Sequence, residues 1–352
     1  MRLLILTQKV DIHDPVLGFF HRWIEEFAKH ARQVTVIALG VGEYHLPQNV
    51  RVFSLGKPAQ GWSASDGERF FSRFKYSVRF YHLIWRERKN YDAVFVHMNP
   101  EYVILGGFLW RLWGKKIALW YTHKSVDLKL RLAEKFADDI FTASKESFRL
   151  PSKKVMVMGH GIDTNLFSGA RKREKKEGAQ ISILHVGRIT SIKNLEAVVE
   201  ALNILKNDQK VDARAVFVGA PVTESDKEYL KKLQKSVNDR NLSTVVSFVG
   251  AVSHDRVPSY YASADIVVNL SDTGSIDKAV LEGMASGVHV LTSNEAFKNI
   301  LPQHCMVSKN PKEIAKRIVL LAHRTPELAL RDYVAGRHSL PRLVDLIVKI
   351  YE

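Results

Sequence analysis

Two cations stand in a short loop between an expected strand and an expected helix. The run ISILHVG ends at Gly187, a helical pattern begins near Asn194, and Arg188 and Lys193 lie between them. Free backbone N–H groups and the helix dipole both attract an anion to a helix N-terminus. Arg can bind two phosphate oxygens in a fork and Lys supplies a point charge, so the loop indicates a diphosphate site. Solvated surface charges are the alternative that this spacing leaves open.

A single carboxylate stands in an expected helix of apolar and small residues. The stretch SDTGSIDKAVLEGMASG (271–287) is typical of a loop followed by a helix, with Glu282 in about the second turn. Because helical side chains point back toward the N-terminus, this carboxylate could reach a ligand over the loop. It would suit a ribose diol, since it can accept two hydrogen bonds. A salt-bridged helix acid is the alternative.

A third loop, in FVGAVSHDRVPSYY, follows a strand that ends at Gly250. Ser253 is the expected cap of the next short helix, with Asp255 in its first turn. Backbone groups around Val252 could meet a flat nucleobase. An ordinary capped connection is the other interpretation.

Short strands rich in Val, Ile, Leu and Phe alternate with helical patterns along the whole chain. Such strands predict parallel sheets covered on both faces. Two series of them predict an α/β protein with two doubly wound domains, residues 1–168 and 169–339, divided at the charged stretch GARKREKKEGAQ. The amphipathic tail 340–352 is an expected helix that could pack back on the first domain. In such sheets ligands bind beyond the carboxyl ends of strands, where the three loops lie.

Composition and charge limit the compartment and the partners. The 352 residues are 46% hydrophobic and carry a net charge of +15, which attracts nucleotides, anionic lipids or nucleic acid. The single cysteine, Cys305, excludes an internal disulfide framework and favours a reducing compartment. MRLLILTQKVD is too short for a signal peptide, and no apolar stretch approaches the roughly 18 residues of a spanning helix. We therefore expect a cytoplasmic protein.

Residues 69–89 form an expected helix with seven Lys and Arg, one acid and seven aromatic residues. One interpretation is a core-packed helix with a solvated basic side. The other is a helix that docks on anionic lipid, and FLWRLWGKK (108–116) has the same character. Nucleic acid is the alternative partner for this positive charge, but no recognised nucleic-acid-binding module is present. The candidate membrane residues are Arg69, Arg73, Phe74, Arg79 and Trp85.

Three segments, HVGRITSIKN, FVGAVSHDRVPSYYASADIVVNL and VLEGMASGVHVLTS, in this order resemble the family 4 glycosyltransferases of the GT-B fold. DPVLGFFHRWIEEFAKHARQVTVIAL, YTHKSVDLKLRLAEKFADDIFTASKES and GHGIDTNLF resemble that family more weakly. The resemblance implies two Rossmann-like domains facing across a cleft. It implies a nucleotide-sugar co-substrate bound mainly by the second domain, an acceptor bound by the first, and transfer with retained anomeric configuration. It implies neither a metal nor a further cofactor.

The resemblance also assigns roles by position. Arg188 and Lys193 match the pair that holds the donor diphosphate and neutralises the leaving group. His123 matches a histidine that contacts the transferred sugar, and these three are the candidate catalytic residues. Glu282 matches the acid that holds the ribose hydroxyls, and Gly18 the loop glycine that lets backbone approach the phosphates and the acceptor. The other candidate donor-binding residues are Gly187, Val252, Ser275, Ile276, Asp277 and Lys278.

The chain departs from the family pattern before Glu282. The family often has a second acid eight residues earlier, near the donor sugar, and here that position is Gly274. Asp277 either substitutes for this acid or stabilises the helix N-terminus. Lys278 could add a cation near the phosphates.

We therefore expect a hexosyltransferase-like enzyme that acts on a glycan or lipid-linked acceptor at the inner face of the membrane. A sugar-nucleotide epimerase of the same fold is one alternative, but it would need additional acids in the cleft. A non-catalytic sugar-nucleotide or lipid-binding protein is the other, and Gly274 is the only argument for it.

Overall fold

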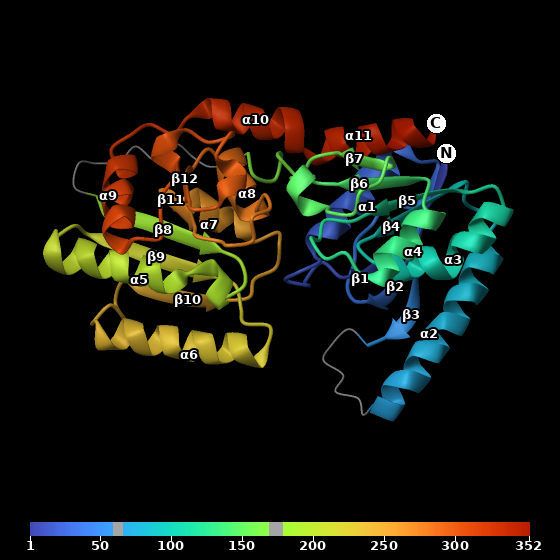
Figure 1. Ribbon diagram of the computed structural model, residues 1–352, viewed down its shortest axis with the longest axis horizontal. Coiled ribbons are helices and arrows are strands. Elements are labelled where there is room, and N and C mark those ends of the chain that lie inside the picture. Colours follow the sequence, from blue (N-terminus) through green and yellow to red (C-terminus); the bar gives the residue numbers. More distant parts are fainter. Residues whose placement is uncertain (59–65, 169–178) are drawn as a thin grey trace. The chain divides into compact units, whose positions relative to one another are not determined.

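The computed structural model describes the backbone of residues 1–58, 66–168 and 179–352, and the side chains of these ranges except 66–73. The chain forms two compact units, shown in Figure 1. One contains Met1–Gly161 and Leu340–Glu352, and the other contains Ile162–Ser339. The unit boundary therefore precedes the break expected at residue 169. Ile162 and Phe167 belong to the second unit because their side chains are buried in its core.

A parallel sheet of seven strands forms the first unit, in the order β3-β2-β1-β4-β5-β6-β7. Its strands are β1 (Arg2–Val10), β2 (Gln33–Val41), β3 (Val50–Lys57), β4 (Ala93–His97), β5 (Lys116–Trp120), β6 (Asp139–Thr142) and β7 (Val155–Val157). Its helices are α1 (Phe19–His30), α2 (Asp66–Glu87), α3 (Pro100–Leu112), α4 (Leu128–Phe136) and α11 (Leu340–Tyr351).

Helices cover both faces of this sheet. Successive side chains of a strand point to opposite faces, and both faces are apolar here. On β1, Leu3 and Ile5 join a core cluster with α1 and α11. Leu4 and Leu6 join a second cluster with α2, α3 and α4. The apolar stripe of α11 is therefore buried in the first unit, although α11 follows the second unit in the sequence.

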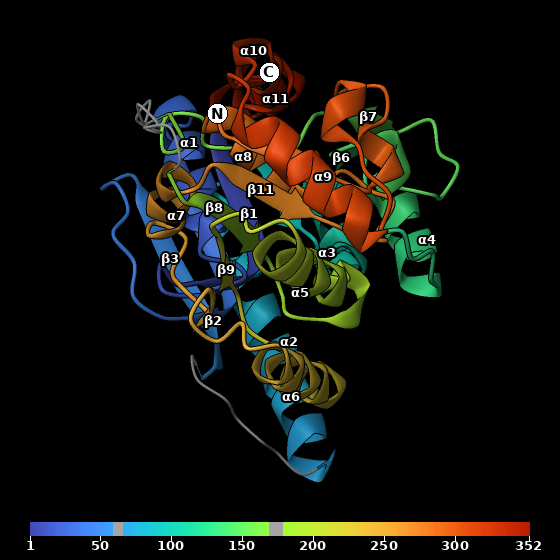
Figure 2. The same ribbon diagram turned by 90° about the vertical axis from the view of Figure 1, so that its left-hand side faces the viewer.

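A parallel sheet of five strands forms the second unit, in the order β10-β9-β8-β11-β12. Its strands are β8 (Ile181–Val186), β9 (Ala213–Val218), β10 (Val246–Gly250), β11 (Ile266–Asn269) and β12 (His289–Thr292). Its helices are α5 (Leu195–Asn203), α6 (Glu224–Asp239), α7 (Val257–Ser263), α8 (Lys278–Ala285), α9 (Pro311–Ala322) and α10 (Leu328–His338). Figure 2 shows α9, α5 and α6 side by side.

Both units place their first strand where the strand order reverses. β1 lies between β2 and β4, and β8 lies between β9 and β11. In doubly wound sheets this is the place where ligands bind, beyond the carboxyl ends of the strands. The predicted α/β class with two doubly wound parallel sheets is confirmed. Within the described ranges, no helix is long and apolar enough to cross a membrane.

Candidate functional site

The candidate residues of the second unit lie on the loops that follow β8, β10 and β11, and on α8, which follows the last of these loops. Because the strands are parallel, these loops leave the sheet at one edge. Gly187 has a φ of 146°, which L side chains rarely adopt, and so allows the sharp turn after β8. Asn194 then joins two loops, since its side-chain amide donates to the Leu270 carbonyl at 2.8 Å and to the Asp272 carboxylate at 3.0 Å.

The two predicted cations of the first loop have different surroundings. Arg188 is exposed, and no acid in the described part of the chain forms an ion pair with it. Lys193 is only 9% exposed. Its Nζ donates to Ser271 Oγ at 3.1 Å and lies 3.0 Å from Asp277 Oδ1. Arg188 is therefore open to a ligand, whereas Lys193 is paired within the protein.

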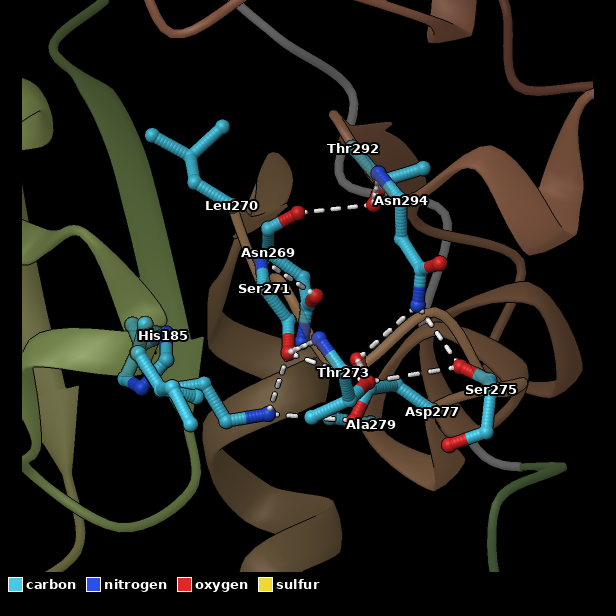
Figure 3. Close-up of polar contacts among 12 residues, drawn as sticks. His185, Asn269, Leu270, Ser271, Thr273, Ser275, Asp277, Ala279, Thr292 and Asn294 are labelled. Atoms are coloured by element: carbon cyan, nitrogen blue, oxygen red, sulfur yellow. Dashed lines mark hydrogen bonds and ion pairs between the residues drawn. The ribbon is translucent and has the colours of Figure 1, made fainter. Parts of the chain in front are cut away.

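Asp277 is held through both carboxylate oxygens, in the network shown in Figure 3. Oδ1 meets Lys193, and Oδ2 accepts hydrogen bonds from Asn294 Nδ2 at 3.2 Å and Thr273 Oγ1 at 3.4 Å. Asn294 also donates to the Ser275 carbonyl at 2.7 Å, which fixes the turn before α8. Asp277 occupies the N-cap position of α8, but its side chain makes no capping hydrogen bond. The carboxylate is directed at Lys193 instead.

Gly274, at the position of the missing acid, has a φ of 60°. This left-handed conformation costs other residues about 1–2 kcal/mol. The backbone of this turn therefore favours glycine, and the candidate replacement carboxylate is that of Asp277, three residues later.

Glu282 is buried on α8, and its two oxygens face different groups. Tyr261, on α7, donates its hydroxyl hydrogen to Oε2 at 2.9 Å. Oε1 lies 3.9 Å from Nε2 of His254, on the loop after β10. Burial raises the pKa of Glu282, against the opposing effects of Tyr261 and the nearby Lys278. Burial also lowers the pKa of Lys278 to about 8, although Glu282 opposes the shift.

The side chains of two predicted donor-binding residues point into the protein. Val252 and Ile276 are half-buried and pack against the apolar core of the second unit. Only backbone groups of these residues are therefore suited to meet a ligand at this edge of the sheet.

A buried histidine lies beneath this loop. His185, on β8, is 1% exposed and its Nδ1 lies 3.3 Å from the Val268 carbonyl, so Nδ1 carries the hydrogen. Nε2 has no hydrogen-bond partner in the described structure. Burial and the charge of Lys193 lower the pKa of His185 to about 4, so the ring is neutral near pH 7.

Sequence reasoning missed the side chains that surround Glu282 and Asp277. His254 and Tyr261 stand in the segment from which only Val252 was chosen. Asn294 follows the strand VHVLT, and a polar residue after a strand at this edge was the signal for it. The buried partner Ser271 follows β11 in the same way, so the same signal applied to it.

His123 and Gly18 belong to the first unit. His123 is exposed after β5, and its Nδ1 accepts the Ser125 N–H at 3.1 Å, so a neutral ring carries its hydrogen on Nε2. Gly18 precedes α1, where a Cβ would lie 2.5 Å from the Asp14 carbonyl oxygen. The fold of the loop itself therefore requires glycine at this position.

The basic aromatic helix is α2, which presents two unlike faces. Phe80, Leu83 and Ile84 are buried in the core. Arg79 is exposed, and the Arg88 guanidinium lies 4.4 Å from the Trp85 ring centroid. The side chains of Arg69 and Arg73 lie outside the described residues. We define the α2–α3 apolar patch as the exposed residues Phe74, Val78, Tyr81, Trp85, Phe108 and Leu112.

No group of three or more His, Cys, Asp and Glu side chains in the described ranges could hold a metal ion.

Sequence comparisons connect this site to a family. Residues 168–329 match the family model described as Glycosyl transferases group 1. The chain is 24% identical to the sulfoquinovosyl transferase SQD2 of Arabidopsis thaliana, over 58% of this chain and 38% of that protein. It is 27% identical to an alpha-monoglucosyldiacylglycerol synthase of Streptococcus pneumoniae, over 34% of this chain and 26% of that protein.

A third relative is a GDP-mannose-dependent alpha-(1-6)-phosphatidylinositol monomannoside mannosyltransferase of Mycobacterium tuberculosis. It is 25% identical over 44% of this chain and 42% of its own length. The matched region therefore spans less than half the length of each of these curated relatives.

Solved structures match the whole chain. HepE of Anabaena, in complex with UDP and glucose, has a TM-score of 0.72 and 17% identity over 99% of both chains. WaaG, a glycosyltransferase of lipopolysaccharide biosynthesis, has a TM-score of 0.66 and 14% identity over 99% of both chains. At this identity the likeness shows the fold, and the predicted GT-B fold is confirmed.

Proposed function

Since this chain carries a domain of the glycosyl transferases group 1 family, we propose that it moves a sugar from a nucleotide-sugar donor to a hydroxyl acceptor. The proposed acceptor is a glycan or a lipid-linked molecule. The observation that carries the proposal is the position of the exposed Arg188 and the buried Glu282 at one edge of the second sheet. One group suits a diphosphate and the other a ribose, which are the two constant parts of a nucleotide-sugar.

Arg188 is the main candidate for stabilising the leaving group. Its guanidinium can bind two phosphate oxygens, and it has no competing acid in the described structure. Fixed positive charge directed at a developing negative charge lowers the barrier to bond cleavage. Lys193 contributes less, because Asp277 already neutralises it. The backbone N–H of Leu195, the first of α5, contributes less as well, because it already donates to the Tyr229 hydroxyl.

We propose transfer with retained configuration, as the family resemblance implies. The acceptor oxygen forms its bond to the anomeric carbon on the face from which the diphosphate departs. The acceptor proton passes to the leaving phosphate oxygen, and the anomeric C–O bond electrons go to the diphosphate. His123 is the candidate contact to the transferred sugar.

We also propose that the α2–α3 apolar patch meets an anionic membrane at its inner, cytoplasmic face. Aromatic and leucine side chains suit the headgroup region, and nearby Arg79, Arg88 and Arg111 suit lipid phosphates. The monoglucosyldiacylglycerol synthase and the phosphatidylinositol monomannoside mannosyltransferase carry lipids in their names, which supports a lipid-linked acceptor here.

The test is calorimetric titration of the full chain with a panel of nucleoside diphosphates and their sugars, at fixed salt. The donor that binds is then incubated with anionic liposomes that contain candidate lipid acceptors, and transferred sugar is quantified. We expect one nucleotide class to bind, and transfer to require both acceptor and liposome.

Three outcomes would contradict the proposal in different ways. Binding without turnover on any acceptor would favour a non-catalytic binding protein. Conversion of the donor to its epimer without an acceptor would favour the epimerase. Absence of binding by every nucleotide, with liposomes present, would refute the donor site itself.

A further inference from the structure

We infer that His254 is a second ribose-contacting residue, and that its Nε2 and Glu282 Oε1 together bind one hydroxyl of the nucleotide. The inference depends on the proposed function, because it names a contact within the same donor site. The sequence and the family resemblance assign His254 no role.

The position of His254 follows from packing within the second unit. Its ring meets the edge of Phe167, with ring centroids 5.9 Å apart at 75°. Phe167 is itself buried and packs edge-on against Tyr261, at 5.5 Å and 85°. One buried phenylalanine thus positions both the histidine and the tyrosine that face Glu282.

The two oxygens of Glu282 face different side chains, Tyr261 and His254. Tyr261 is fully buried and donates to Oε2, so it fixes the rotation of the carboxylate. Burial, followed by the charge of Glu282, raises the pKa of Tyr261 well above its ordinary value and keeps this donor protonated. Oε1 remains directed at His254.

The distance from His254 Nε2 to Glu282 Oε1 is 3.9 Å, which is longer than a hydrogen bond. The two atoms are close enough for a third group to contact both. The His254 side chain is 21% exposed and that of Glu282 is 10% exposed, so a ligand can approach the pair.

The chemistry of the pair selects a hydroxyl. With its hydrogen on Nε2, the imidazole donates, and the carboxylate only accepts. A hydroxyl oxygen can accept the imidazole hydrogen while its own hydrogen goes to Oε1. A phosphate oxygen would be repelled by Glu282, and an ammonium group has no lone pair for the imidazole hydrogen.

The test measures whether the loss of affinity caused by changing His254 depends on the presence of one particular ribose hydroxyl. Wild type, His254→Ala and His254→Gln are titrated calorimetrically with the nucleoside diphosphate that binds best and with its 2′-deoxy and 3′-deoxy analogues. Gln can place an amide N–H near the position of Nε2. We expect His254→Ala to weaken the parent nucleotide about tenfold, the usual effect of one lost hydrogen bond. His254→Gln should recover most of this loss.

The deoxy analogues separate a contact from a general effect on the site. The analogue that lacks the hydroxyl contacted by His254 should bind wild type and His254→Ala with equal affinity, because that contact is already missing. Equal weakening of all three ligands, or no weakening of the parent, would overturn the inference while leaving the donor site intact. Should wild type bind no nucleotide at all, the proposed function fails first. His254→Asn replaces His254→Ala if the alanine variant does not fold, as judged by its thermal transition.

Discussion

The first loops of the two units occupy the same place in their sheets but distribute charge differently. At the carboxyl end of β1, Lys9 pairs with Asp14 at 2.8 Å and with Asp11 at 3.1 Å, and both acids belong to the loop that follows. After β8, Lys193 pairs with Asp277, which belongs to the loop after β11, and Arg188 is exposed. The first loop is neutralised locally, whereas the second keeps an open cation.

This difference shows that the shared topology does not by itself create an anion site. Both loops begin at the carboxyl end of a central strand, where ligands bind in doubly wound sheets. The location of the acids decides whether a cation there remains available. In the first unit the acids also hold the loop, because Asp14 accepts the Val16 and Leu17 N–H groups at 2.9 and 2.7 Å.

The largest expected effect comes from removing the open cation. Arg188→Ala should lower kcat/KM for the donor about a hundredfold or more, because one directed charge at a leaving group has this value in other enzymes. Lys9→Ala, the matched change beside the first loop, should lower kcat/KM less than tenfold. Steady-state kinetics at one salt concentration measure both. Equal losses in the two variants would show that the loops do not differ in function.

A smaller effect is expected from the acid that neutralises Lys193. Asp277→Asn keeps an oxygen for Lys193 but removes the negative charge, so the nucleoside diphosphate should bind about tenfold more tightly. Calorimetry at low and high salt measures the gain, which should shrink as salt screens it. If Asp277 instead replaces the missing acid near the sugar, the variant will lose turnover without a gain in diphosphate affinity.

The fold and part of the site could be predicted because apolar runs mark buried strands and polar loops follow them. Arg188 and Glu282 were located by this rule and by the family resemblance. The Lys193–Asp277 pair could not be predicted, because it joins residues 84 positions apart through side-chain conformations. The Tyr261–Glu282 hydrogen bond is of the same kind.

The boundary between the units was misplaced for a related reason. The charged stretch at 169–180 is the visible change in composition, but burial decides which unit a residue joins. Ile162 and Phe167 are apolar residues that precede that stretch in the sequence. Only their packing assigns them to the second unit.

The turn before α8 offers a test of backbone preference. Gly274→Glu restores the acid of the family pattern but forces it into a left-handed conformation, so the protein should lose about 1–2 kcal/mol of stability. Gly274→Ala is the control, since it adds the strain without the charge. Thermal unfolding of both variants measures the loss, and donor turnover should not rise in either. A rise with Glu alone would show that this site accepts the family acid after all.

The smallest effect concerns two carboxylates whose pKa values shift in opposite directions. Burial favours the neutral form of Asp14, but the hydrogen bonds from Lys9, Leu17 and Val16 outweigh it and lower its pKa. The stability from Asp14 is therefore complete above its unfolded pKa of about 4 and is lost as the pH falls through the lower folded value. Asp14→Asn should cost up to about 1 kcal/mol at pH 7, and this cost should shrink as the pH falls below about 4.

Glu282 should show the reverse dependence, because burial raises its pKa. Its charged form destabilises the fold once the pH rises above the unfolded value of about 4.3, so Glu282→Gln should match or exceed wild-type stability at pH 7. The amide can donate to the Tyr261 oxygen, while that hydroxyl donates to the Ala279 carbonyl, 3.0 Å away. Thermal midpoints of wild type and both variants at pH 7, 5 and 3 measure these changes. A carboxylate kept at a cost in stability is expected where a ligand requires it, so Glu282→Gln should bind nucleotide more weakly even as it folds more stably. A stability loss at pH 7 in both variants would show that Glu282, like Asp14, serves the fold.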